Sequence, residues 1–252
     1  MTPPYTGKAW TALPLSGFDL ETTGPDPLTA RIVSASVVHI DGSAVQTRNW
    51  LLDPGIEIPA GAAEVHGITT ERARAEGMDY VTGLSEIRAE LEMAWSLGRA
   101  VVIFNGSYDC TVMSIESARL GLPKFSPRMV IDPFVLDRHL DPRRPGSRRL
   151  EATVAHYGLT MGQAHTADAD ALAASRLAWV IARAFPEIAH LTGEQLMELQ
   201  AGAHQHRAAG LRDWMLRKVE TMRAAAARLL ANADELNERA DSVSGEWPIR
   251  GR

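Results

Sequence analysis

The chain has 252 residues, of which 45% are apolar and 23% charged, as is ordinary for a globular protein. Its net charge of −5 argues against a protein that coats nucleic acid by bulk electrostatic attraction, but allows an enzyme that binds a few nucleotides locally. The single cysteine, Cys110, excludes an internal disulfide framework. With no apolar signal core near the N-terminus and no apolar run long enough to span a bilayer, we expect a cytoplasmic protein without membrane contact.

The N-terminal part of the chain predicts three consecutive strands. The stretch Phe18-Asp19-Leu20-Glu21-Thr22-Thr23-Gly24 follows an apolar run at 12–15, and side chains alternate faces along a strand, so Asp19 and Glu21 are expected to project the same way. Residues 31–40 and 45–52 are β-rich and are separated by Asp41-Gly42, which is typical of a hairpin turn. These segments predict an antiparallel meander.

The middle of the chain alternates strands with helices, which predicts parallel pairing. A helix is expected over 81–97, with Gly98 as its C-terminal stop. The continuous apolar run at 100–104 is typical of a strand buried on both faces, and a second short strand is expected at 129–132. Further helices are expected from 109 to 120, 133–140, 150–157 and 166–184. Together the two halves predict a mixed five-stranded sheet flanked by helices.

Two segments lie outside this pattern. The loop at 141–149 carries four arginines and is either a solvated connection or a contact for backbone phosphates. After Pro186 the composition changes, and Thr192 with Gln195 fits a capping box that opens a long helix. The sequence thus predicts a domain at 1–188 and a helical C-terminal extension at 189–252. An apolar stripe follows the extension at helical spacing and is expected to bury against the first domain or against a partner; it comprises Leu211, Trp214, Met215, Val219, Met222, Ala226 and Leu229.

Further acidic residues are placed where they could complete a metal site with Asp19 and Glu21. Asp109 follows the buried strand at a helix start, and His165 and Asp170 flank the start of the 166–184 helix, with Asp168 between them. Functional groups of open α/β sheets gather at strand ends and helix starts, so these side chains are expected to converge. Four carboxylates in a dry site are unstable without cations, and two Mg²⁺ or Mn²⁺ ions about 3.5–4 Å apart would compensate them. A histidine in such a cluster suits a general base.

The motifs FDLETTG, FNGSYD and HTADAD, in this order, resemble the DnaQ-like 3′–5′ exonucleases, in the DEDDh branch with four acids and a histidine. The resemblance covers residues 12–185 and extends to VHGIT at 65–69 and VIDPFVL at 130–136. It places the family's acids on Asp19, Glu21, Asp109 and Asp170, its histidine on His165, and prefers Asp170 over Asp168 as the ligand. Departures occur at Phe104 and Tyr108, where histidine and phenylalanine are common in the family.

This resemblance implies a ribonuclease-H-like fold and stepwise release of nucleoside 5′-monophosphates from a 3′ end. One ion would be held by Asp19, Glu21 and Asp170, the second by Asp19 and, through water, Asp109, while His165 takes a proton from the attacking water. The resemblance further implies that Glu21, Thr22 and Thr23 meet the 3′ end and that Leu20 wedges against the last base. His66 and Asn105 would line the terminal-nucleotide pocket.

Two alternatives stay open at this point. An RNA-trimming enzyme like the oligoribonucleases shares the same five residues, although the ETTG sequence favours the branch that acts on DNA. The expected substrate is then the 3′ end of single-stranded DNA. The second alternative is an accessory or proofreading subunit that docks on a DNA polymerase through the C-terminal helices.

Overall fold

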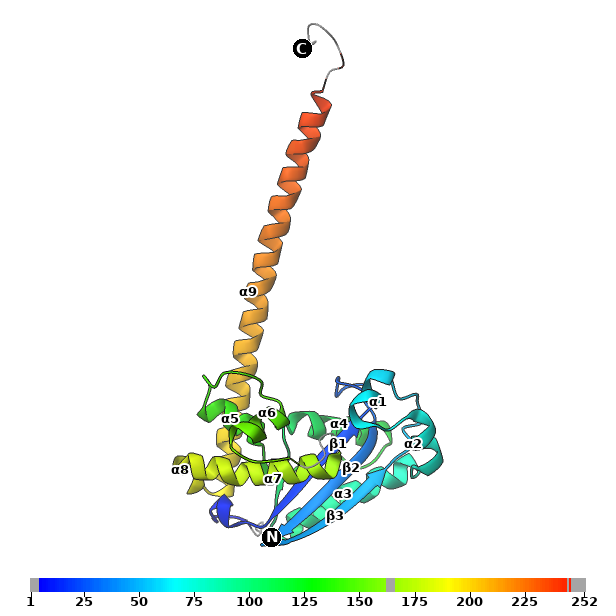
Figure 1. Ribbon diagram of the computed structural model, residues 1–252, viewed down its shortest axis with the longest axis vertical. Coiled ribbons are helices and arrows are strands. Elements are labelled where there is room, and N and C mark those ends of the chain that lie inside the picture. The colour runs from blue at the N-terminus through cyan, green and yellow to red at the C-terminus, as the bar shows by residue number, and fades with distance from the viewer. Residues whose placement is uncertain (1–4, 162–165, 244, 246–252) are drawn as a thin grey trace. The chain divides into compact units, whose positions relative to one another are not determined.

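A computed structural model of the chain describes residues 5–161, 166–243 and 245. It divides into two compact units, Met1–Ala203 and His204–Arg252. The first unit contains a five-stranded sheet with helices on both faces, and the second is the greater part of one long helix (Figure 1). None of the described helices combines the length and the apolar composition that crossing a membrane requires.

The sheet is mixed and has the strand order β3-β2-β1-β4-β5. Strands β1 (Leu15–Thr22), β2 (Ile32–Asp41) and β3 (Ala44–Leu51) pair antiparallel, which confirms the predicted meander. Gly42 adopts φ 62° in the β2–β3 turn, a conformation that glycine reaches without steric cost. Strands β4 (Ala100–Val102) and β5 (Val130–Ile131) extend the sheet in parallel from β1. The predicted fold class is therefore confirmed.

Most of the predicted helices also form. They are α1 (Ala60–His66), α2 (Thr70–Glu76), α3 (Tyr80–Ser96), α4 (Ser107–Arg119), α5 (Pro133–Leu140), α6 (Leu150–His156), α7 (Ala167–Ala184), α8 (Pro186–Ala189) and α9 (Gly193–Asp241), besides one 3₁₀ turn at Trp10–Ala12. Gly98 takes φ 79° just after α3, as expected for a glycine that ends a helix. The capping box is present, because the N–H of Thr192 donates to Gln195 Oε1 (2.9 Å) and the N–H of Gln195 to Thr192 Oγ1 (3.3 Å).

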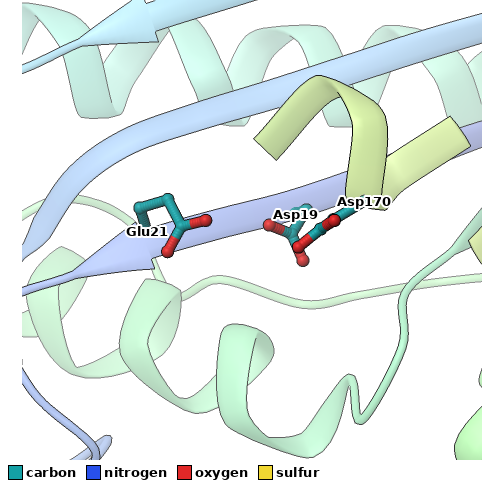
Figure 2. A group of neighbouring side chains, drawn as sticks. All are labelled: Asp19, Glu21 and Asp170. Carbon is teal, nitrogen blue, oxygen red and sulfur yellow. The ribbon is translucent and has the colours of Figure 1, made fainter. Parts of the chain in front are cut away.

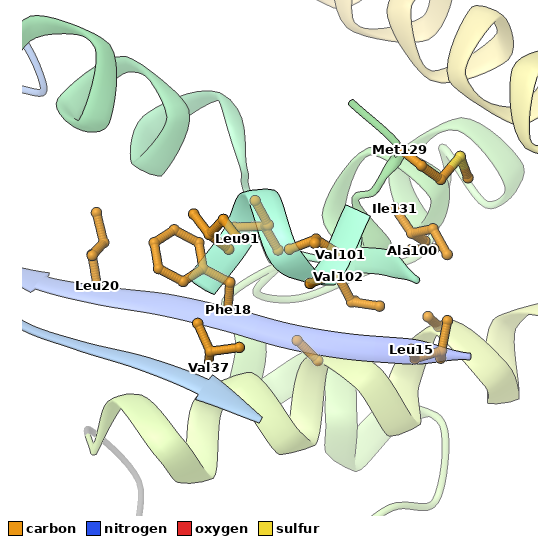
Figure 3. Packing of buried hydrophobic residues seen from close by; sticks show 14 of the residues in the cluster. Leu15, Phe18, Leu20, Val37, Leu91, Ala100, Val101, Val102, Met129 and Ile131 are labelled. Atoms are coloured by element: carbon orange, nitrogen blue, oxygen red, sulfur yellow. The ribbon is translucent and has the colours of Figure 1, made fainter. Parts of the chain in front are cut away.

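Helix α7 packs directly on the backbone of β1. At Gly17 an added Cβ would lie 2.3 Å from the carbonyl oxygen of Ala171, so only glycine permits this approach. Phe18, the next residue along β1, has its side chain in the core on the other face of the strand (Figure 3). The alternation of side chains along β1 therefore directs Asp19 and Glu21 toward the side of the sheet that α7 covers.

The first turns of α9 belong to the first unit. Leu196 is fully buried, and the side-chain amide of Gln200 binds the outer edge of β5. The N–H of Asp132 donates to Gln200 Oε1 (2.6 Å), and Gln200 Nε2 donates to the carbonyl of Val130 (3.0 Å). Gln200 thus satisfies a donor and an acceptor of an edge strand that would otherwise lack a neighbour on that side.

Candidate active site

Three carboxylates gather where β1 meets the start of α7. Asp19 and Glu21 project from the same face of β1, and Asp170 projects from the first turn of α7 (Figure 2). One oxygen from each of the three lies within 4.8 Å of the others. Carboxylate oxygens at this spacing are the ligands that hard divalent cations prefer, so this group, the carboxylate cluster, could hold a metal ion.

Asp109 adds a fourth charge from the first turn of α4. Its side chain is buried, with only 4% of the residue exposed, and its charge is among those that raise the pKa of Asp19. The residue reaches this place because α4 starts within five residues of the end of β4, the parallel neighbour of β1. The structure therefore brings together Asp19, Glu21 and Asp170 as one group, with Asp109 beside Asp19.

The electrostatics of this group disfavour four negative charges. Burial, and then repulsion by Asp109, Glu21 and Asp170, holds the pKa of Asp19 well above its usual range. Burial and the charge of Asp170 raise the pKa of Glu21 to about 7, and burial raises the pKa of Asp109 to about 8. Such carboxylates bind protons near neutral pH unless a cation compensates their charge, so the donor set fits divalent metal ions.

An open cleft of about 820 Å³ begins at the carboxylate cluster. Asp19 and Asp170 line one part of it. Another part is lined by the exposed Arg149 and by the rings of Phe104 and Phe134, which pack edge to face with their centroids 5.4 Å apart. Flat aromatic rings can stack with a nucleotide's base, and a cation beside a metal-binding group can pair with its phosphate.

The sequence of this fold identifies its family. A sequence model of the exonuclease family matches residues 16–178, which is more than half of the chain. The chain belongs to this exonuclease family. It is a DnaQ-like exonuclease by sequence, and the ribonuclease-H-like sheet agrees with that assignment.

Solved structures of exonuclease I share the fold of this exonuclease. E. coli exonuclease I in complex with a dT13 oligonucleotide matches with a TM-score of 0.59 at 20% identity over 70% of this chain. Exonuclease I from Methylocaldum szegediense matches with a TM-score of 0.56 at 21% identity, again over 70% of this chain. The chain covers 42% of the length of both proteins, and at this identity the likeness establishes the fold alone. A search of curated proteins found no match.

Some predicted site residues of the exonuclease lie outside or beside the cluster. His165 falls outside the described residues, so its position stays a prediction. Asp168 lines a neighbouring cleft of about 340 Å³ together with Glu21, His66 and Arg72. His66 is buried at the end of α1, and its Nδ1 accepts from the N–H of Ile68 (3.2 Å). Burial lowers the pKa of His66, so its ring is kept neutral.

The residues expected to meet the 3′ end have structural partners of their own. Thr22 Oγ1 lies 2.5 Å from the hydroxyl of Tyr108 and donates to the carbonyl of Gly24, which also accepts from Tyr108. Thr23 is buried, and its hydroxyl accepts from the N–H of Arg31 (2.9 Å). The side chain of Leu20 lies in the hydrophobic core on the face of β1 opposite Asp19.

Asn105 lines the cleft in a strained conformation. It is the one non-glycine residue among those described that has a positive φ, at 63°. The carboxylate of Asp132 supports this turn by accepting the N–H groups of Asn105 and Gly106, both at 2.9 Å. We did not predict this role for Asp132 from the sequence. Its signal is the Asp-Pro pair that opens α5, where the same carboxylate also accepts from Phe134 and Val135.

The structure corrects one expectation about the arginine loop. Arg144 and Arg148 do not offer free charges to phosphates, because both bind the buried carboxylate of Asp137. Burial would raise the pKa of Asp137, but hydrogen bonds from both arginines hold it below its usual range. Arg143 and Arg149 remain exposed. These ion pairs anchor the loop to α5. Arg148 and Arg149 both line the cleft, and of the two Arg149 is the exposed one.

Proposed function

We propose that this exonuclease removes nucleotides from the 3′ end of DNA by hydrolysis and releases nucleoside 5′-monophosphates, as a member of the DEDDh branch. The observation that carries the proposal is the carboxylate cluster, with Asp19, Glu21 and Asp170 converging from β1 and α7 at the head of the cleft. The order of these residues and of Asp109 and His165 along the sequence supports the assignment to that branch.

Two divalent ions, Mg²⁺ or Mn²⁺, fit the donor set. Asp19, Glu21 and Asp170 would hold one, and Asp19 with Asp109, the latter through water, would hold the second. Such ions, when bound, lower the pKa of water and neutralise charge on a phosphodiester during in-line displacement. The raised pKa values of Asp19, Glu21 and Asp109 support this proposal, because burial and, after it, mutual repulsion raise them, and bound cations would compensate the buried charges.

The protein's own groups would supply the proton acceptor and the binding surface. His165 precedes Asp170 by five residues and would take the proton of the attacking water. Phe104 and Phe134 would stack with bases, and Arg149 would pair with a backbone phosphate. Asn105 and His66 are proposed to contact the terminal nucleotide. Leu20, Thr22 and Thr23 would then act by shaping the backbone around Glu21.

A DNA substrate is favoured over RNA by the ETTG sequence and by the oligonucleotide complex of E. coli exonuclease I, which shares the fold. A panel of single-stranded DNA, duplex DNA with mismatched ends and short RNA, each labelled at the 5′ end, tests this choice in the presence of Mg²⁺. We expect a ladder that shortens from the 3′ end of single-stranded DNA. Faster degradation of short RNA would instead favour the oligoribonuclease alternative.

Two variants test the roles in the site. Asp19→Ala is expected to abolish Mg²⁺-dependent mononucleotide release, and full activity in that variant would contradict the metal assignment. His165→Ala is expected to retain Mn²⁺ binding, measured by calorimetry, and to lose most turnover. If it loses its metal ions yet turns over normally at saturating Mn²⁺, the general-base role is wrong.

A further inference from the structure

The second unit presents a long apolar surface on α9. Met215, Met222, Leu229 and Leu236 are all more than half exposed on this helix, and Val219 is 41% exposed. Apolar residues recur here at alternating steps of four and three, which is the spacing of a coiled-coil seam. We call the following set the seam: Met215, Val219, Met222, Ala226, Leu229, Ala233, Leu236 and Ala240.

Larger apolar residues alternate with alanine along the seam, except at Val219. Met215, Met222, Leu229 and Leu236 occupy one heptad position, and Val219, Ala226, Ala233 and Ala240 occupy the other. In a parallel pair each position faces itself, so layers of two alanines would alternate with layers of two leucines or methionines. Such layers differ greatly in volume and leave voids between the helices.

An antiparallel pair removes this mismatch, because each of the two positions then faces the other. When Ala226 of one copy lies opposite Leu229 of the second, every alanine of the seam faces a leucine or a methionine. Val219 then faces Leu236, Met222 faces Ala233, and Met215 faces Ala240. The register is symmetric about the middle of residues 214–241, an overlap of about 42 Å of helix.

The charges of the same segment favour the same orientation. Residues 214–227 carry three basic side chains (Arg217, Lys218, Arg223) and one acidic side chain (Glu220), for a net charge of +2. Residues 228–241 carry two basic side chains (Arg228, Arg239) and four acidic ones (Asp234, Glu235, Glu238, Asp241), for a net charge of −2. Antiparallel pairing places each basic half beside an acidic half, whereas parallel pairing places like halves together.

We propose that the protein dimerises through residues 214–241 of α9, which form an antiparallel coiled coil with the same segment of a second copy. The seam fits this partner by layer volume, and the two charge halves fit it by sign. The proposal is independent of the exonuclease activity, since the seam shares no residue with the carboxylate cluster or the cleft.

Sedimentation equilibrium of the full chain tests the association. We expect a dimer in the wild type and an increase of at least about 100-fold in its dissociation constant for Leu229→Glu, since two buried leucines are lost per dimer. Ala231→Glu is the matched control, because Ala231 lies on the back of the helix, and it is expected to leave the dissociation constant unchanged. Circular dichroism checks that both variants keep the helix. A monomeric wild type, or equal effects of the two variants, would overturn the proposal.

Disulfide trapping tests the orientation. In a Cys110→Ser background, chains carrying Ala226→Cys are mixed with chains carrying Leu229→Cys and oxidised. Antiparallel pairing in the stated register predicts a mixed disulfide dimer as the main product. A dominant disulfide between two Ala226→Cys chains would show that the helices pair in parallel and would overturn the proposed arrangement.

Discussion

The Glu21→Gln substitution tests whether the carboxylate cluster is maintained at the expense of stability. Burial and the charge of Asp170 raise the pKa of Glu21 from 4.5 to about 7. The folded protein therefore keeps a proton that the unfolded chain releases, and the free energy of unfolding falls as the pH rises from 4.5 to 7. The difference between the two pKa values corresponds to about 3 kcal/mol, reached in full above pH 7. Gln has a similar shape and no proton to lose, so it avoids this cost.

Urea unfolding in the presence of EDTA measures the effect. At pH 8 we expect the variant to be more stable than the wild type by up to about 3 kcal/mol, and at pH 4.5 we expect little difference. Added Mn²⁺ should stabilise the wild type more than the variant at pH 8, because Gln supplies a weaker ligand. Glu92→Gln, on the exposed side of α3, is the control and should change neither value. A variant that is less stable than the wild type at pH 8 without metal would refute the reasoning.

Substitutions at three further positions probe the supports of the site. Gly17→Ala should cost about 1–3 kcal/mol in urea unfolding and reduce nuclease activity, because the added Cβ pushes α7 away from β1. Asp137→Asn should cost about 3–5 kcal/mol, since it leaves two buried guanidinium groups without their carboxylate. Because the pKa of Asp137 is lowered in the folded state, the wild type loses this stability as the pH falls through that pKa. The melting temperature of the variant should therefore decrease less at acidic pH than that of the wild type. Asn105→Ala should cost about 1–2 kcal/mol, whereas Asn105→Gly should be close to neutral, because φ 63° is strained for alanine and not for glycine.

The parts of the fold that follow from local periodicity could be predicted from the sequence. The period of two along β1 places Asp19 and Glu21 on one face, and the uninterrupted apolar run before Asn105 indicates a strand buried on both faces. Periodicity does not predict which distant residue each polar side chain will contact in the folded protein. The four arginines of the 141–149 loop are equivalent in sequence, and only packing against α5 brings Asp137 to two of them.

The backbone contacts near the site could not be predicted from the sequence for the same reason. Thr23 is part of the FDLETTG motif, yet its hydroxyl accepts the N–H of Arg31, the residue just before β2. The positive φ of Asn105 is supported by a carboxylate 27 residues away, at Asp132. The two charge halves of α9, in contrast, are already present in the sequence, although the net charge of residues 214–241 is zero.

The start of α9 decides where the chain can be shortened. Gln200 binds both the N–H of Asp132 and the carbonyl of Val130, and Leu196 is fully buried in the core, so the first unit continues to Ala203. A chain that ends after Pro186 loses these contacts and exposes the edge of β5, which predicts aggregation or a large loss of stability. A chain that ends after Ala203 keeps them and lacks residues 204–252, which include the segment 214–241 that we propose forms the dimer.

Parallel expression of the two shortened chains tests this argument. We expect the chain ending at Ala203 to be soluble and monomeric, with the melting temperature of the first unit intact and the nuclease activity retained. The chain ending at Pro186 should melt at a lower temperature or fail to remain in solution. Equal stability of the two would show that Gln200 and Leu196 are dispensable to the sheet. A dimer that persists without residues 204–252 would place the contact between copies elsewhere than on α9.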